Sequence, residues 1–174
     1  MTANKPAQWQ QSGLRLWWLA IIILVLDQVT KIWVAQALPL FGRVDVLPFF
    51  DLVHVRNYGA AFSFLSDQGG WQRWFFTIIA IVIVSVLAVM LRRQSLHYRW
   101  LNLSFTLIIG GALGNVLDRV RLGYVVDFLD VYVGTYHWPA FNVADSAIVL
   151  GALLMIYDSF FGSGAKSEAN KSSS

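Results

Sequence analysis

Polar and ionisable side chains gather in one stretch of the chain, residues 110–145, beside segments that are otherwise apolar. The stretch contains Asn115, Asp118, Arg119, Asp127, Asn142 and Asp145. Ionisable groups at membrane depth are costly, so a cluster of them is by default a hypothesis for a functional site. These residue types predict a hydrolytic site with two aspartates at a membrane surface.

The two aspartates that short connections can bring together are Asp127 and Asp145. Two close carboxylates in a low-dielectric site cannot both ionise easily, so the pKa of one of them rises. Such a pair holds one proton between a base and an acid, as in aspartic proteases. The ionised partner draws a proton from water that attacks a carbonyl, and the protonated partner hydrogen-bonds the carbonyl oxygen.

Helical spacing places the neighbouring polar residues on shared faces. Asn115, Asp118 and Arg119 fall at positions i, i+3 and i+4, and Asn142 and Asp145 fall at i and i+3. Arg119 can pair with Asp118 and lock the end of the third span. Asparagine amides can orient the carboxylates or the substrate without adding charge.

Each of these residues also has a structural interpretation. Asn142 stands directly before an apolar helix and is a plausible N-cap. Asp118 and Arg119 can form no more than a buried pair, and Asp130 can be a solvated loop charge. Taken one residue at a time, the structural and the functional interpretations have about equal weight.

Other catalytic plans fit the sequence less well. The chain has no cysteine, no G-x-S-x-G motif and no H-E-x-x-H motif, and its single glutamate, Glu168, lies in the polar tail. His54, His97 and His137 are far apart and are interpreted as interface or loop residues. We therefore expect no metal and no cofactor. The formal charge of +3 is spread through loops and tails, which argues against a nucleic-acid partner.

The composition predicts an integral membrane protein. The 174 residues are 57% hydrophobic and 13% charged, whereas soluble domains have about 25% charged residues. We predict an all-α membrane protein with four transmembrane helices, at about residues 14–38, 71–91, 100–119 and 141–161. Residues 1–162 form a single domain, and residues 163–174 form a disordered cytoplasmic tail.

The first span has two interpretations. Ala35-Gln36-Ala37 resembles a signal-peptide cleavage site, but Asp27 and Lys31 interrupt the apolar run, which favours an uncleaved helix. Because Asp27 and Lys31 are four residues apart, they share a helix face and can pair. In the structural interpretation, Lys31 snorkels to the outer interface with Asp27 as its tethered partner. The alternative is a direct functional role for the two residues, and the two interpretations do not exclude each other.

The longest connection, residues 39–70, contains two β-prone runs, residues 44–47 and 52–55, separated by Pro48. Residues 57–59 suit a turn, and residues 60–65 suit the start of a short surface helix. We predict two short bent or edge strands followed by this helix.

Positive charges are biased towards one side of the predicted spans. The predicted cytoplasmic side carries seven of them: Lys5, Arg15, Arg92, Arg93, Arg99, Lys166 and Lys171. The opposite side carries three, Arg43, Arg56 and Arg121. This bias predicts an even number of spans and both termini in the cytoplasm. The polar cluster then lies near the outer surface.

A non-enzymatic function is the alternative class: a small channel or transporter, or a scaffold that uses the polar cluster to hold helices together. The chain shows no inverted repeats and no broken helices, which argues against a transporter. A transporter would also place its polar groups near the midplane rather than near one surface.

Five motifs, in order, resemble the lipoprotein signal peptidase (signal peptidase II) family of bacterial aspartyl peptidases. They are residues 27–31 (DQVTK), 57–62 (NYGAAF), 114–119 (GNVLDR), 123–128 (GYVVDF) and 141–145 (FNVAD). The resemblance extends from Leu16 to about Tyr157.

The resemblance implies a multi-pass peptidase of the bacterial inner membrane, with catalytic Asp127 and Asp145 near the periplasmic surface. Its substrate would be a prolipoprotein, cleaved on the N-terminal side of a diacylglyceryl-modified Cys. Residues implied to support or bind around the pair are Asp27, Lys31, Asn57, Gly59, Asn115, Arg119 and Asn142. The resemblance further implies that residues 39–70 form a small extracytoplasmic β-rich cradle plus a short surface helix. It also implies contact with membrane lipids and inhibition by globomycin-type peptides. We expect a monomer, since one chain contains every motif.

Overall fold

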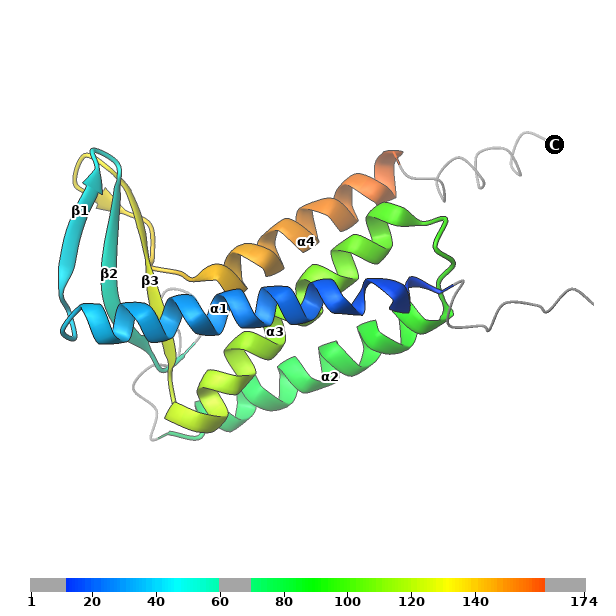
Figure 1. The fold of residues 1–174 in the computed structure, drawn as a ribbon, viewed down its shortest axis with the longest axis horizontal. Helices are drawn as coiled ribbons and strands as arrows, with labels where there is room; N and C mark the ends of the chain where they lie inside the picture. The colour runs from blue at the N-terminus through cyan, green and yellow to red at the C-terminus, as the bar shows by residue number, and fades with distance from the viewer. Residues whose placement is uncertain (1–11, 60–69, 162–174) are drawn as a thin grey trace, which may run out of the picture.

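Four long helices and a small sheet at one end of them make up the computed structural model, which describes residues 12–59 and 70–161 (Figure 1). The helices are α1 (Trp17–Ala37), α2 (Gln72–Arg93), α3 (Arg99–Leu122) and α4 (Val143–Phe161), and a short turn, η2 (Gly13–Leu16), precedes α1. All four are long and apolar enough to cross a membrane. The start of α1 and the end of α4 lie at the end opposite the sheet (Figure 1). The prediction of four apolar helices that are long enough to span a membrane is therefore confirmed.

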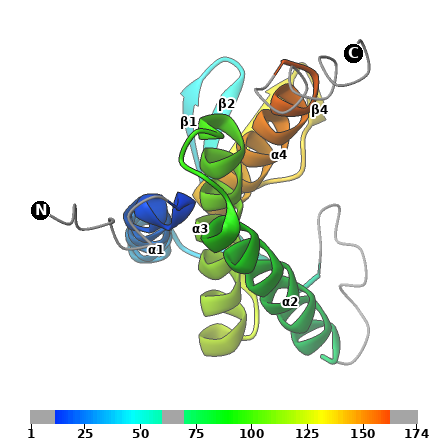
Figure 2. The same ribbon diagram turned by 90° about the vertical axis from the view of Figure 1, so that its right-hand side faces the viewer.

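Helix α3 is the centre of the bundle, and α1, α2 and α4 pack around it (Figure 2). Glycines permit the close approach of these helices. A Cβ atom at Gly111 would collide with the backbone carbonyl of Ala144 on α4, and one at Gly110 would lie 2.9 Å from the carbonyl oxygen of Ala20 on α1. The backbone of α3 thus touches two neighbouring helices directly.

The outward faces of the other helices are apolar. Ile78 and Val82 on α2 are 61% and 56% exposed, and Val25 and Val29 on α1 are exposed to a similar degree. Apolar surfaces of this extent are rare on soluble monomers and are expected where a helix faces lipid.

The sheet has four antiparallel strands in the order β1-β2-β3-β4: β1 (Arg43–Leu47), β2 (Phe50–Asn57), β3 (Val125–Val133) and β4 (Tyr136–His137). The two strands predicted within residues 39–70 are confirmed. The predicted surface helix at residues 60–65 and the tail at residues 163–174 lie outside the described residues.

Strand β3 was not predicted. The sequence analysis left residues 118–140 as a surface connection, whereas α3 continues to Leu122, ends at Gly123 with φ 88°, and leads directly into β3. A left-handed residue after the last turn is a common helix ending that glycine adopts without strain. The start of β3, which is apolar and β-branched, then pairs with β2. This pairing joins β3 and β4 to β1 and β2 in one sheet.

The pairing of β2 with β3 sets the position of the chemistry. Asn57 lies opposite Val125 and Val55 opposite Asp127, with a register shift between Leu52 and Val55. The chain then returns beside β3, where the N–H groups of residues 128 and 129 donate to the carbonyl of Phe141. The sheet thereby holds the start of α4 next to Asp127.

Replacing Gly111 with valine should destabilise the fold by about 1–3 kcal/mol or more, because the new side chain meets backbone atoms of α4 that cannot move independently. Thermal unfolding of the purified protein in detergent measures this. Val82→Leu on the exposed face of α2 is the control and should leave the midpoint unchanged. Equal midpoints for Gly111→Val and the wild type would contradict the packing described.

Candidate active site

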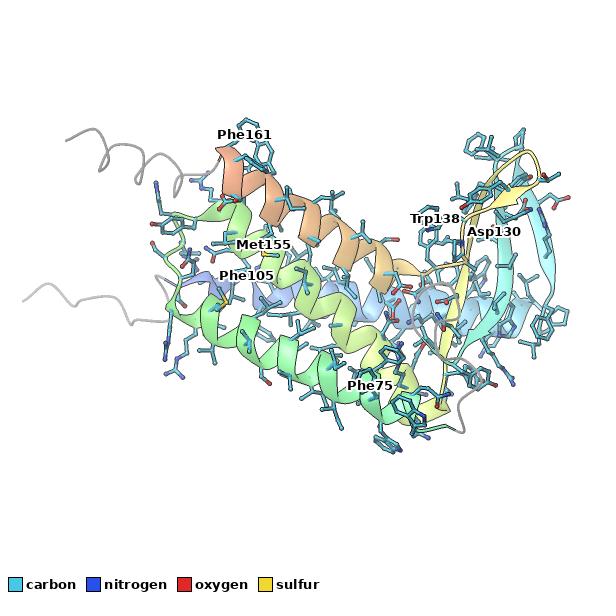
Figure 3. All side chains as sticks on the ribbon, turned by 180° about the vertical axis from the view of Figure 1, so that it is seen from behind. Phe75, Phe105, Asp130, Trp138, Met155 and Phe161 are labelled. Carbon is cyan, nitrogen blue, oxygen red and sulfur yellow. The ribbon has the colours of Figure 1, made fainter. Side chains whose placement is uncertain are left out.

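Asp127 on β3 and Asp145 in the first turn of α4 line the same cavity, which has a volume of about 810 Å³. Asn57, Asn115 and Arg119 line it too. The cavity lies at the sheet end of the bundle, where Trp138 marks the connection between β4 and α4 (Figure 3). Small-molecule and peptide subsites usually have volumes of about 300–1,000 Å³, so this space can admit a substrate segment.

One wall of the cavity is apolar and lies along the outer face of α4. Ile148, Val149, Leu150 and Leu153 form it, and the last three are 51–58% exposed. A cavity with such a wall opens towards the lipid rather than only towards water.

Asp127 is held by two side-chain amides. Its Oδ1 accepts a hydrogen bond of 2.7 Å from Asn142 Nδ2, and its Oδ2 accepts one of 2.9 Å from Asn57 Nδ2. The residue is 2% exposed. The carboxylate is thus fixed at both oxygens while its side chain lines the cavity.

Asp145 is held by a third amide, since its Oδ1 accepts a hydrogen bond of 2.7 Å from Asn115 Nδ2. Its backbone N–H donates to Asn142 Oδ1 at 2.9 Å. Asn142 therefore caps α4, as its sequence position predicted, and it also binds Asp127. The N-cap interpretation of this residue is confirmed, and the same side chain contacts the carboxylate of Asp127.

All three asparagines have their amide orientation fixed from the oxygen side. Asn57 Oδ1 accepts the N–H of Gly59 at 3.0 Å, Asn142 Oδ1 accepts the N–H of Asp145, and Asn115 Oδ1 accepts Lys31 Nζ at 2.9 Å. An amide has acceptor capacity at its oxygen and donors at its nitrogen. Anchoring each oxygen on a donor turns each NH₂ group towards a carboxylate of the pair.

Lys31, which fixes the orientation of Asn115, lies on α1, whereas Asp127 and Asp145 lie on β3 and α4. Its ammonium group contacts Asp27 Oδ2 at 2.9 Å, Asp118 Oδ2 at 3.1 Å and Asn115 Oδ1 at 2.9 Å, and the side chain is 2% exposed. A lysine has three donors, and three acceptors meet them. The predicted pair of Asp27 with Lys31 is confirmed, and the snorkelling interpretation is wrong because the group is buried.

Asp118 pairs with Lys31 and not with Arg119, which corrects the pair suggested from the sequence. Its Oδ2 also accepts the N–H of Val126 at 3.1 Å, and its Oδ1 accepts Gln28 Nε2 at 2.9 Å. Arg119 instead donates from Nη2 to the carbonyl of Gly59 at 3.0 Å. Adjacent residues on a helix point about 100° apart, so each finds a partner on a different element.

Asp27 links α1 to α4. Its Oδ1 accepts the backbone N–H of Ala144 at 2.9 Å, one of the N–H groups at a helix start that no carbonyl within the helix can satisfy. The structure thus brings together Asp27, Lys31, Asn57, Gly59, Asn115, Arg119, Asp127, Asn142 and Asp145, all of which the sequence analysis named.

A family model and curated relatives both match this chain over most of its length, and both are signal peptidases of lipoproteins. The family model described as Signal peptidase (SPase) II matches residues 19–161. The Lipoprotein signal peptidase of Shewanella oneidensis is 55% identical over 166 residues, which cover 95% of this chain and 96% of the relative. That of Psychromonas ingrahamii is 55% identical over 157 residues, covering 90% and 91%.

This chain belongs to the lipoprotein signal peptidase family. Two solved structures, each described as a bacterial membrane enzyme structure obtained by the in meso method, share its fold with TM-scores of 0.75. They are 33% and 31% identical and cover 84% of this chain, and the chain covers 88% and 94% of them. Signal peptidases II cleave signal peptides from prolipoproteins. The membership of this chain in the family favours a peptidase over the channel, transporter and scaffold alternatives.

The structure also corrects the interpretation of Asp130, which lies on β3. Asp130 is 7% exposed, not a solvated loop charge, and its carboxylate lies 2.9 Å from His137 Nδ1. Sequence reasoning also gave no role to Gln28, whose amide bridges Asp118 and Asp27 at 2.9 and 3.2 Å. Its place inside the 27–31 motif, on the turn of α1 that carries Asp27 and Lys31, was the available signal.

Burial raises the pKa of Asp127 to about 7 from its usual 3.8, and the neighbouring Asp145 carboxylate adds to this rise. Hydrogen bonds from Asn57 and Asn142 oppose it, because they favour the ionised form. A carboxyl with this pKa exchanges a proton near neutral pH, which suits general acid and base chemistry. In the part of the chain that the structure describes, no group of three potential metal ligands occurs.

The effect of removing the charge of Asp127 should depend on pH. Because the folded pKa is about 7 and the usual value is 3.8, the protonated folded form is favoured below about pH 4, and this contribution is lost as the pH rises to about 7. The free energy of unfolding of Asp127→Asn, relative to that of the wild type, should then be about 1–3 kcal/mol higher at pH 8 than at pH 5. The new NH₂ group faces the amide donor of Asn57 or Asn142 and lowers the stability at both pH values alike.

Thermal unfolding at both pH values measures this effect. Asp45→Asn is the control, since the Asp45 side chain is 82% exposed and should show no gain that depends on pH. A change in stability for Asp127→Asn that is the same at pH 5 and pH 8 would show that the pKa of Asp127 is not raised.

Proposed function

We propose that this protein is an aspartyl endopeptidase of the bacterial inner membrane that removes the signal peptide from prolipoproteins. It cleaves on the N-terminal side of a diacylglyceryl-modified Cys, using water activated by Asp127 and Asp145. The observation that carries this proposal is that both carboxylates line one cavity and each is held by a directed asparagine amide. The chemistry requires no metal and no cofactor.

The pair acts with one shared proton. The ionised carboxylate takes a proton from water as the water oxygen attacks the scissile carbonyl, and the protonated carboxyl donates to the developing oxyanion. Collapse of the tetrahedral intermediate breaks the C–N bond, and a proton passes to the leaving amine of the lipidated Cys. The raised pKa of Asp127 supports this scheme, because the pair then retains its proton at neutral pH.

The supporting residues restrict the pair without adding net charge to it. Asn57, Asn115 and Asn142 each donate one N–H to a carboxylate oxygen and keep it at the cavity wall. Arg119 holds the carbonyl of Gly59, and through it the turn that carries Asn57. Carboxylates that are already fixed lose little conformational entropy when the substrate binds. Such positioning lowers the activation barrier of the reaction.

The substrate enters sideways from the bilayer. An apolar signal helix and two acyl chains remain in lipid, so the scissile bond lies at the membrane surface. The exposed apolar wall formed by Val149, Leu150 and Leu153 supports lateral entry, because these side chains face lipid beside the aspartates. Globomycin-type cyclic peptides would occupy the same cavity.

We assign the sheet end of the bundle to the periplasm and both termini to the cytoplasm. Arg92 and Arg93 at the end of α2 and Arg99 at the start of α3 flank the turn between these helices, which lies at the end opposite the sheet (Figure 1). Clustered arginines in a short loop favour the cytoplasmic side. We also propose that the monomer is active, since one chain supplies every group of the site.

Asp127→Asn and Asp145→Asn should each reduce cleavage of a lipidated prolipoprotein by at least about 10³-fold, because each variant lacks one half of the acid–base pair. Gel mobility of the substrate, with and without globomycin, measures cleavage by the purified protein. Asp45→Asn, far from the cavity, should cleave normally, and Asp118→Asn should mainly lose stability. Normal turnover in either variant of the pair would refute the proposed mechanism.

Asn57→Ala should shift the alkaline limb of the kcat/KM profile upwards by about one pH unit, because it removes a hydrogen bond that favours ionised Asp127. The control is Asn102→Ala. Asn102 is also buried, but its amide donates to the carbonyl of Ser95 at the other end of the bundle. That variant should change stability alone. If both variants leave the limb at the same pH, Asn57 does not tune the pair.

A further inference from the structure

A second cavity, of about 270 Å³, lies at the same end of the bundle but between α1 and the end of α3. Gln28, Lys31, Ile32 and Gln36 of α1 line one side, and Asp118, Arg121 and Leu122 of α3 line another. His54 and Arg56 of β2, with Tyr124 and Val126 near the start of β3, complete it. The proposed chemistry uses the buried ammonium of Lys31 but not the open part of this cavity.

The charges that line this second cavity are mostly positive. Lys31, Arg56 and Arg121 are cationic, and Asp118 is the only acidic residue among the lining residues. The carboxylate of Asp118 already accepts from Lys31, Gln28 and the N–H of Val126. Lys31 also pairs with Asp27, so the buried ammonium and its two carboxylates carry one net negative charge, and the two guanidinium groups leave the cavity with one net positive charge.

Neither arginine has a carboxylate partner among the described residues. The guanidinium of Arg56 lies 4.6 Å from the centroid of the Tyr124 ring, and Arg121 Nη1 reaches Gln28 Oε1 at 3.5 Å. Both side chains are exposed. Stacking on Tyr124 holds Arg56 at the cavity without using its donors, which then remain free for an anion.

An apolar track leads along α1 to the mouth of this cavity. Val25, Val29 and Ile32 fall at positions i, i+4 and i+7, so they share one face of the helix, and they are 47–58% exposed. Ile32 and Leu122 belong to the cavity lining. The cavity thus joins an anion-binding end to a lipid-facing stripe.

We propose that this cavity binds the phosphate headgroup of an anionic phospholipid, with Arg56 and Arg121 as its ligands and an acyl chain on the α1 stripe. The volume suits a headgroup and excludes a whole lipid. Guanidinium groups bind phosphate oxygens through paired N–H donors, which explains the choice of arginine. Arg56 also lines the cavity that contains Asp127, and it directly precedes Asn57 on β2. A lipid bound to Arg56 therefore contacts the strand whose Asn57 side chain hydrogen-bonds Asp127.

The test is lipid retention by the full-length protein, measured by native mass spectrometry from nanodiscs of equal parts phosphatidylglycerol and phosphatidylcholine. The wild type should retain phosphatidylglycerol, and Arg56→Gln/Arg121→Gln should retain about tenfold to a hundredfold less, since two charge-assisted contacts are lost. Arg92→Gln/Arg93→Gln, which removes the same charge at the other end of the bundle, is the control and should bind as the wild type does.

Three results would overturn the proposal. Equal retention of both lipids by the wild type would show that the cavity does not select a lipid by the charge of its headgroup. Equal loss in the control variant would show a general charge effect. Thermal protection by inorganic phosphate alone, equal to that by phosphatidylglycerol at the same concentration, would show a free-phosphate site. Arg56→Lys/Arg121→Lys keeps the charge, so a failure of this variant to bind while folded would show that the arginine geometry is required.

Discussion

The site depends on the burial of one ammonium group. An isolated charge in a low-dielectric interior is strongly unfavourable, and it persists only when charged and polar partners surround it. Lys31 meets this requirement with Asp27 on its own helix and with Asp118 and Asn115 on α3. These contacts fix the rotation of α1 against α3. The same contacts place Asp27 where it accepts the N–H of Ala144, so α4 is tied to α1 as well.

Amide groups of fixed orientation connect this ammonium to the proposed catalytic pair, Asp127 and Asp145. Lys31 donates only, so it draws the oxygen of Asn115 and turns the nitrogen towards Asp145. The Oδ1 atoms of Asn142 and Asn57 accept backbone N–H groups, which leaves the Nδ2 atom of each amide facing Asp127. A carboxylate that accepts from such an amide receives a hydrogen bond without a full positive charge beside it. Asp127 can therefore keep a pKa of about 7 although two donors face it.

Much of the fold and of the site follows from the sequence, because apolar run lengths define spans and motif residues mark the polar cluster. The partners of those residues do not follow, since helix periodicity gives faces but not which helix a face meets. Asp118 was assigned to its neighbour Arg119 for this reason, whereas it faces Lys31 on α1. Strand β3 was missed because Asp127 and Asp130 interrupt its apolar pattern. Both are buried and paired only once β2, α4 and β4 lie beside them.

The hydrogen bond from Ala144 to Asp27 joins residues 117 positions apart and spans the first and last helices. A membrane chain is synthesised from its N-terminus, so α1 exists long before α4. During that interval Asp27 lacks its helix-start partner, and Lys31 lacks both α3 acceptors until α3 arrives. The charged pair in α1 is therefore least stable in the bilayer early in biogenesis and becomes fully satisfied only on insertion of the final span. The step that completes the fold is thus also the step that delivers Asp145, and the proposed hydrolytic pair cannot form in a partly inserted chain.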